Sequence, residues 1–285
     1  MNRNHINLRV WGEWACFTRP EMKVERVSYP LMTPSAARGV LEAIFWEPQM
    51  YYLIDQIRVV QRGRWTAFRR NEVTSRISLR NTREWMTTPE KFQPIQAGGG
   101  APDGTQRNML ALADVEYIIN AEVRLSELGK RSGQNERKYV EEIMRRARSG
   151  KCFHRPSLGV REFAADFEGE DDAETAHVRR LSELKGTSGD WTESLGLMLY
   201  DLFDADKRTV GFRWLSDEEI ISINTEHEAH FKELKPAERR KLAKEPVPRI
   251  DGQLVRPQAA FFRAHVKDSV LDCHHSRVEL VRREA

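Results

Sequence analysis

The sequence predicts an α+β protein whose first part, residues 1–168, is a ferredoxin-like domain. Stretches that alternate apolar and polar residues, as strands do, enclose two stretches with the apolar spacing of helices. Their order is strand, helix, strand, a long connection with room for another strand, helix and strand, which is close to the ferredoxin-like pattern. At 285 residues, the chain is also long enough to bury a core without disulfides.

The first half of this domain contains a strand, a helix and a second strand. Residues 6–17 alternate in polarity and predict the first strand. Thr33 and Pro34 predict a helix start, because threonine is a good N-cap and proline suits the first helical position. The helix should end before Pro48, and residues 51–60, rich in β-branched and aromatic side chains, should form the next strand. The buried face of the helix is expected to carry Ala37, Val40, Leu41 and Ile44.

The second half contains a strand over residues 115–125, a helix over 135–149 and a strand over 160–167. Gly150 predicts the end of the helix. The helix is expected to turn Tyr139, Val140, Ile143 and Ala147 inward. Residues 166–174 contain six acids and no base, and we expect them to form a solvated loop between domains.

A smaller antiparallel β-rich domain is predicted for residues 169–285. Its expected strands are residues 195–203, 210–214 and 259–266. Residues from about 215 to 258 are expected to form a helical insertion, with a capping box at Ser216–Glu219 and a basic helix after Pro236. The basic helix is expected to contact nucleic acid or a neighbouring subunit, or to be a solvated hairpin.

The composition indicates a cytoplasmic protein without a membrane span, and we expect no cofactor. The mean hydropathy is -0.63, and no run of about 18 apolar residues is present. The N-terminus lacks the apolar region of a signal peptide. The three cysteines, Cys16, Cys152 and Cys273, are far apart and form no CxxC pair, which argues against a zinc ribbon or a disulfide framework.

The net charge of +3 says little about partners, but one stretch is strongly basic. It contains eight arginines against the single acid Glu72: Arg58, Arg62, Arg64, Arg69, Arg70, Arg76, Arg80 and Arg83. Arginine makes two-pronged contacts with phosphate, and Trp65 and Phe68 are candidates for stacking on unpaired bases. With so few acids nearby, we favour a polyanion-binding surface over a solvated face.

Several motifs resemble one known family in their order along the chain. They lie at residues 17–29, 34–48 (PSAARGVLEAIFWEP), 69–73 (RRNEV), 145–150 (RRARSG) and 158–163 (LGVREF). The chain resembles the CRISPR-associated "Cas five" family, in its type I-C (Dvulg) form. The resemblance covers roughly residues 6–214 and resumes around Phe261 and Phe262.

The resemblance implies an RRM-like domain followed by a smaller β-rich domain. It also implies binding to CRISPR repeat RNA at the 5′ handle, with backbone and large subunits of the effector complex as partners and target DNA nearby. In type I-C systems, the resemblance implies a cut in precursor RNA that needs no metal and leaves a cyclic phosphate. The residues expected to contact RNA are Lys23, Arg26, Arg38, Arg69, Arg70 and Arg76. For Arg38, a phosphate contact and a solvated position remain equal alternatives.

The catalytic residues are not assigned. The resemblance implies a tyrosine in the first-helix motif, where this chain has Phe45, and a lysine and a histidine on the later central strand, where residues 117–125 have neither. A phenyl ring transfers no proton. Nearby substitutes are Glu122 as a base, Arg124 as a phosphate clamp and Tyr117 as an acid; the alternative is a solvated strand face.

Other candidate groups are weaker. Lys151 and His154 flank Cys152, which allows a cysteine–histidine nucleophile pair, but no orienting residue is evident. His227 and His230, and the run Cys273-His274-His275, lack the spacing of a zinc site. Gly98–Gly100 lack the lysine of a phosphate-binding loop and predict a flexible connection.

Three functions follow from these observations. The first is an RNA-binding subunit that also processes precursor CRISPR RNA. The second is a catalytically silent RNA-binding scaffold that caps the complex, which Phe45 favours. The third is a DNA-contacting protein unconnected with CRISPR RNA, which we disfavour because no expected helix pair has the character of a recognition helix.

Overall fold

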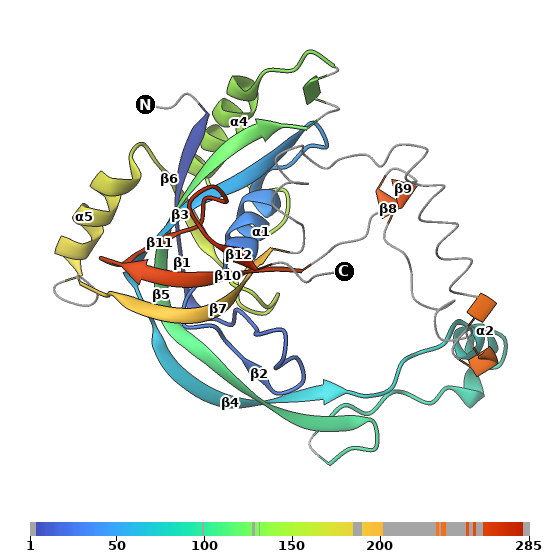
Figure 1. The fold of residues 1–285 in the computed structure, drawn as a ribbon. Helices are drawn as coiled ribbons and strands as arrows, with labels where there is room; N and C mark the ends of the chain where they lie inside the picture. The colour runs from blue at the N-terminus through green and yellow to red at the C-terminus, as the bar shows by residue number, and fades with distance from the viewer. Residues whose placement is uncertain are drawn as a thin grey trace.

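A computed structural model describes residues 4–98, 100–126, 129–130, 132–184, 190–201, 232–233, 235–237, 249–250, 253–254 and 259–281. These residues form an α+β structure around one large sheet (Figure 1). The first elements are β1 (His5–Ala15), β2 (Arg26–Val27), α1 (Pro34–Ile44), β3 (Met50–Gln61), β4 (Arg64–Val73), α2 (Leu79–Thr87), η1 (Pro89–Lys91), β5 (Gly104–Leu125) and α4 (Glu136–Arg148). The later elements are β6 (Asp166–Glu170), α5 (Ala173–Glu183), β7 (Glu193–Asp201), β8 (Arg249–Ile250), β9 (Gln253–Leu254), β10 (Ala260–Lys267), β11 (Val270–Asp272) and β12 (Leu280–Val281).

The centre of the sheet has the predicted ferredoxin-like arrangement. Its strand order is β3-β5-β1-β6, and each neighbouring pair is antiparallel. Both α1 and α4 pack on one face of these strands, where apolar side chains form the main core. The fold class expected from the order of elements is therefore confirmed.

Local signals explain where the two core helices begin and end. The Thr33 hydroxyl accepts a hydrogen bond from the amide of Ala36 at 3.1 Å and caps α1. The side chain of Asn135 accepts from the amide of Arg137 at 2.9 Å and caps α4. Gly150, just after α4, has a φ of 65°, which favours glycine. The predicted buried face of α1 is confirmed, since Ala37, Val40, Leu41 and Ile44 are all buried.

The long connection after β3 forms an arm that the sequence did not define. The first half of β5 pairs with β4, and its second half pairs with β3. The change from β3 to β4 occurs at Gly63, whose φ of 79° favours glycine, and a Cβ there would meet Val115 at 2.6 Å. The β4–β5 hairpin extends from the body as an arm that ends at α2 and η1 (Figure 1).

The structure corrects two predictions around residue 168. The strand predicted over residues 160–167 is instead β6, from Asp166 to Glu170. The acidic stretch is not a solvated loop: it supplies β6, and Asp172 caps α5 by accepting from the amide of Thr175 at 2.8 Å. The strand was not recognised because β6 is an edge strand of the sheet, and an edge strand tolerates acidic side chains. A domain boundary at residue 168 would fall inside β6.

The C-terminal strands continue the same sheet. Strand β11 pairs with β3, and β10 pairs with β7, β11 and β12, in each case antiparallel. The predicted strands at residues 195–203 and 259–266 correspond to β7 and β10. The predicted strand at 210–214 lies outside the described residues, as does nearly all of the insertion at 215–258.

The opposite face of the sheet is covered in part by α5. Ala173 and Ala176 of this helix pack against Val60 and Ile118. Figure 1 shows α5 at the side of the sheet away from α1. No described helix is both long and apolar enough to cross a membrane.

Candidate nucleic-acid interface

The exposed face of β4 carries basic and aromatic side chains. Trp65 and Arg69 lie on the same face because strand residues alternate, and both are exposed, Trp65 by 50%. Arg69 and Arg76 form no ion pair with any residue that the structure describes. Their charges therefore remain open to a polyanion.

Other side chains of the basic stretch are engaged within the protein. Arg62 lies 3.4 Å from Glu193, and Arg64 lies 2.6 Å from Asp114. These acids come from outside the stretch, so pairing is less scarce than the sequence indicated. Phe68 packs in an aromatic cluster with Trp14 and Phe163, with ring centroids 5.6 and 5.9 Å away. The expectation that Phe68 stacks on bases is therefore wrong, whereas Trp65 remains exposed.

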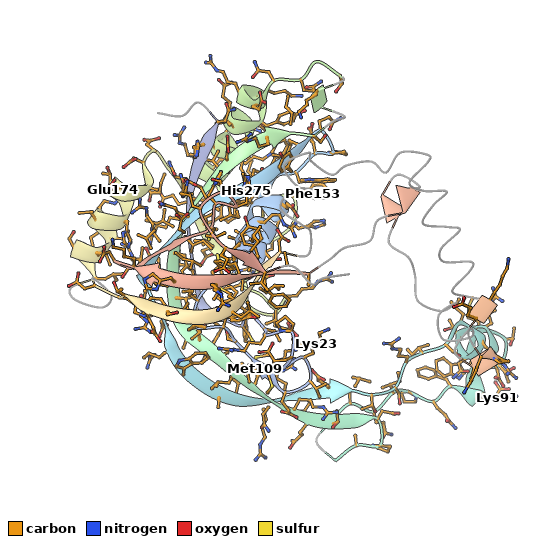
Figure 2. All side chains as sticks on the ribbon, viewed as in Figure 1. Lys23, Lys91, Met109, Phe153, Glu174 and His275 are labelled. Carbon is orange, nitrogen blue, oxygen red and sulfur yellow. The ribbon has the colours of Figure 1, made fainter. Side chains whose placement is uncertain are left out.

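A second group of basic residues lies where the arm joins the body. Arg70 donates a hydrogen bond to Glu72, and Arg26 lies 3.8 Å from the same carboxylate. Two guanidinium groups thus share one acid, and the buried Nε of Arg70 has no hydrogen-bond partner among the described residues. Lys23 is exposed on the connection before β2, beside the base of the arm (Figure 2). This place carries excess positive charge.

Arg38 contradicts the expectation that it contacts either RNA or solvent. It is 8% exposed, and its Nε and Nη2 donate to the carboxylate of Asp201 at 3.0 and 3.1 Å. Burial disfavours its charge, but the nearby Asp201 and Glu42 outweigh this and raise the pKa of Arg38. The helical pattern did not reveal that β7 covers this side of α1. Arg38 is a structural ion-pair residue.

The end of α1, where the resemblance implies a catalytic tyrosine, is filled by an aromatic stack. The ring of Phe45 is 8% exposed and stacks on Tyr139 with centroids 6.3 Å apart. The guanidinium of Arg146 lies 5.1 Å over the Phe45 ring, and the Tyr52 hydroxyl donates to the Phe45 carbonyl at 2.7 Å. Phe45 therefore stabilises the junction of α1 and α4.

The segment after α4 presents an exposed set of polar and aromatic groups beside this junction. The amides of Phe153 and His154 donate to the carbonyl of Ala43 at 3.1 and 2.8 Å, which holds the segment against the end of α1. Phe153 is 76% exposed, and His154, Lys151 and Arg155 are exposed as well. Figure 2 shows Phe153 next to α1.

The sequence signal at Phe153 and Arg155 was an aromatic residue among basic residues, which is typical of RNA-binding surfaces. It was missed because the run is short and its neighbours in space are far away in sequence. Cys152 is half-buried, and nothing in the structure orients it toward His154. A cysteine–histidine nucleophile pair is therefore unsupported.

The substitutes proposed on the later central strand do not form a site. Tyr117 is fully buried, and burial raises the pKa of its hydroxyl. Glu122 and Arg124 pair with each other at 2.7 Å on the opposite face of β5 from Tyr117. The acid and the base would therefore lie on two sides of one sheet, which rules out joint action on one phosphate.

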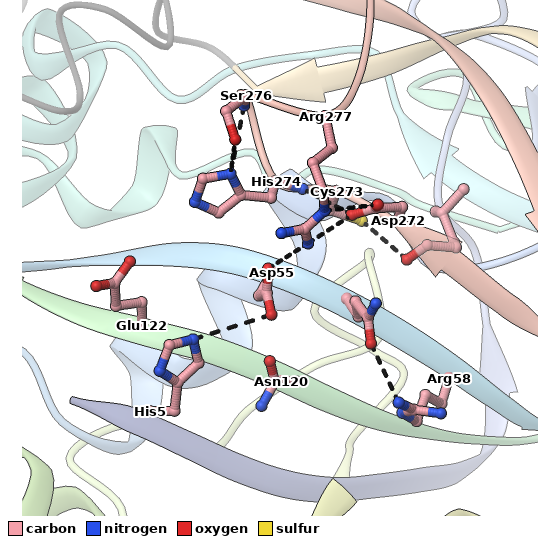
Figure 3. Close-up of polar contacts among 12 residues, drawn as sticks. His5, Asp55, Arg58, Asn120, Glu122, Asp272, Cys273, His274, Ser276 and Arg277 are labelled. Carbon is pink, nitrogen blue, oxygen red and sulfur yellow. Dashed lines mark hydrogen bonds and ion pairs between the residues drawn. The ribbon is translucent and has the colours of Figure 1, made fainter. Parts of the chain in front are cut away.

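A denser polar cluster lies between the opposite sheet face and the C-terminal segment (Figure 3). Arg277 donates to Asp55 at 2.5 Å and to Asp272 at 2.7 and 2.8 Å, and the Nε2 of His5 lies 3.9 Å from Asp55. Burial alone would raise the pKa of Asp272, but the hydrogen bonds from the Arg277 guanidinium outweigh it together with weaker nearby effects, and the pKa is lowered. Because Arg277 serves two carboxylates, this cluster has little charge left to attract RNA. It fastens the C-terminal segment to β3.

The remaining candidate sites hold no catalytic or metal-binding arrangement in the described part of the chain. Cys273 is buried, which raises the pKa of its thiol, and the Nδ1 of His274 is engaged with the hydroxyl of Ser276 at 2.6 Å. No group of three or more potential ligands that could hold a metal ion occurs among the described residues. The histidines at 227 and 230 and the middle glycine of 98–100 lie outside them.

Comparisons with known proteins identify what the chain resembles. Residues 5–240 match the family model for Cas5d, described as CRISPR-associated protein (Cas_Cas5). A protein of Mannheimia succiniciproducens named CRISPR pre-crRNA endoribonuclease Cas5d is 41% identical over 70% of this chain and 85% of its own length. A protein of the same name from Thermus thermophilus is 38% identical over 69% of this chain and 72% of its own length.

The fold also matches that of a solved structure. A crystal structure of a CRISPR-associated protein superposes with a TM-score of 0.50, at 16% identity, over 94% of this chain and 90% of the other. At this identity, the match supports the fold alone.

Proposed function

The chain belongs to the CRISPR-associated Cas5 family, in its Cas5d (type I-C) branch, and we propose that it binds CRISPR repeat RNA and cuts precursor CRISPR RNA without a metal. The observation that carries this proposal is the similarity, over more than two thirds of the chain, to two proteins named pre-crRNA endoribonuclease. Arg69 and Arg76 of the arm, which form no ion pair with a described residue, and the exposed groups at the end of α1 support it. They supply charge for phosphates and rings for bases.

We further propose Lys151 and His154 as the groups that carry the cut. In this step, the His154 imidazole takes the proton of a 2′-hydroxyl, and that oxygen attacks the adjacent phosphorus. The bond from phosphorus to the 5′-oxygen breaks, and the Lys151 ammonium stabilises the phosphorane charge and protonates the departing oxygen. The products are a 2′,3′-cyclic phosphate and a 5′-hydroxyl. The backbone hydrogen bond from His154 to Ala43 supports this assignment, because it holds the segment close in sequence to Phe45, the position that the resemblance gives to a tyrosine.

A catalytically silent RNA-binding scaffold is the second candidate function. The specific observation that favours it is Phe45, which occupies the position of the family tyrosine and is buried in an aromatic stack. In that case, another nuclease would cut the precursor, and this chain would hold the 5′ handle in place.

As partners, we propose CRISPR repeat RNA and the backbone and large subunits of the effector complex, with target DNA nearby. We propose a cytoplasmic location, because the three cysteines are free, as is usual in a reducing compartment.

The test is to incubate the purified full chain with its cognate repeat RNA in EDTA. A product that ends in a cyclic phosphate, and that disappears when the 2′-hydroxyl at the cut site is replaced by hydrogen, would support the ribonuclease. Tight binding without a product would favour the scaffold, and absence of binding would refute both.

The variant His154→Ala tests the assigned residue. His265→Ala is the matched control, because His265 is also exposed but lies on β10. Loss of cleavage with retained RNA affinity only in His154→Ala would support the assignment. Equal cleavage by both variants would remove His154 from the reaction.

A further inference from the structure

A groove runs along the outer side of α1. It has a volume of about 370 Å³, which lies within the roughly 300–1,000 Å³ of ligand pockets. Ser35, Gly39 and Ala43 of α1 line it on the helix side, and Thr18, Arg155 and Ser157 from other segments also line it. The described residues that line the groove include one cation and several hydroxyls but no carboxylate.

Glycine at position 39 is not needed for packing against any residue that the structure describes. Glycine is a poor helix former, and a Cβ added to Gly39 would meet no atom of the described residues within 4 Å. Its φ is not in the left-handed region. Alanine would thus fit and would favour the helix. What glycine adds is an open wall against which another molecule can lie closely.

The wall that carries Arg155 is fixed by backbone hydrogen bonds on both sides. The amide of His154 donates to Ala43 at 2.8 Å, and the amide of Cys16 donates to Leu158 at 2.9 Å. Arg155 itself forms no ion pair with a described residue. A free guanidinium on a fixed wall is suited to bind a phosphate.

The groove lies near the basic group at the base of the arm. Thr18 lines the groove and forms an antiparallel bridge with Ser28, two residues after Arg26. The groove and the basic group are therefore close enough along this connection for one strand of RNA to contact both.

We propose that this groove is a subsite for one nucleotide of single-stranded RNA, with Arg155 on its phosphate and the exposed Phe153 stacked on a neighbouring base. The proposal rests on the proposed RNA-binding function and names the place where that RNA lies. The small volume excludes a duplex, and the absence of carboxylates among the described lining residues suits a polyanion.

The test compares three substitutions at one position in the full chain. Gly39→Ala leaves the groove open, Gly39→Gln fills it, and Gly39→Glu fills it with a like charge. We expect affinity for cognate repeat RNA to follow the order wild type and Gly39→Ala, then Gly39→Gln, then Gly39→Glu, with the last weaker by at least about tenfold. Chemical probing of the bound RNA should show one or two nucleotides protected by Gly39→Ala but not by Gly39→Gln.

Arg155→Ala provides a second readout, with Arg161→Ala as its control, because Arg161 is exposed nearby but does not line the groove. Weaker binding by Arg155→Ala alone supports the subsite. If the wild type binds repeat RNA and Gly39→Glu binds it equally well, the subsite is refuted while the proposed function stands, and a protein segment becomes the occupant to seek. If the wild type binds no repeat RNA, the proposed function itself fails.

Discussion

The arm makes a quantitative prediction about the salt dependence of RNA binding. Arg69 and Arg76 are exposed and form no ion pair with described residues, so each is available for one phosphate. For single-stranded RNA, each phosphate contact contributes about −0.7 to the slope of log affinity against log salt. The double variant Arg69→Ala, Arg76→Ala should therefore reduce the magnitude of the slope by about 1.4. From about 50 to about 200 mM salt, the advantage of the wild type should then shrink about 7-fold.

The assay is a titration of labelled repeat RNA at several salt concentrations. A matched control is the double variant Arg64→Ala, Asp114→Asn, which removes an arginine together with the acid that pairs with it at 2.6 Å. Asp114 has a φ of 57°, a conformation that asparagine tolerates, so the control should fold. Its slope should equal that of the wild type. If the Arg69 and Arg76 variant also keeps the wild-type slope, the assignment of these residues to phosphate contacts is wrong.

Three further predictions concern stability and the end of α1. Asp201→Ala should lower the free energy of unfolding, measured in urea, by about 3–5 kcal/mol, because it leaves the buried Arg38 without its main partner; a loss typical of a surface pair would contradict this. Burial lowers the pKa of His177, whose Nε2 lies 3.0 Å from the carbonyl of Val59. As the pH falls, the unfolded state therefore binds a proton at a higher pH than the folded state does. Stability should thus fall as the pH drops below 6.5, and His177→Gln should flatten this part of the profile; an unchanged slope would refute the assignment. Phe45→Tyr should leave single-turnover cleavage nearly unchanged, because the ring is buried; a gain near the about 10²–10⁴-fold typical of a positioned acid or base would contradict this.

The sequence predicted the core elements well because their signals are local. Thr33 with Pro34, and Asn135 with Gly150, mark the ends of the two core helices through contacts within a few residues. The apolar spacing of α1 likewise showed which side chains are buried. Such features depend on the chain next to them and not on distant partners.

The arm and the edge strand were harder to predict because they depend on partners far away in the sequence. The extent of β5 follows from its pairing with both β3 and β4, and β6 is recognised only by its register with β1. The acids of β6 looked like a loop because an edge strand tolerates charge.

The candidate site shows the same division. Exposed Arg69 and Trp65 followed from composition, since a basic stretch with few acids leaves some charges open. The prediction that Arg38 contacts RNA or solvent failed because its partner, Asp201, is 163 residues away in the sequence. No local pattern could show that pairing.

The most direct test of the account is to map where RNA lies on the protein. The full chain would be crosslinked to cognate repeat RNA that contains 4-thiouridine, and the modified peptides identified by mass spectrometry. We predict crosslinks in the connection with Lys23, in β4 around Trp65 and in the segment with Phe153. Crosslinks confined to α5 and to the cluster around Asp55 and Arg277 would contradict the account.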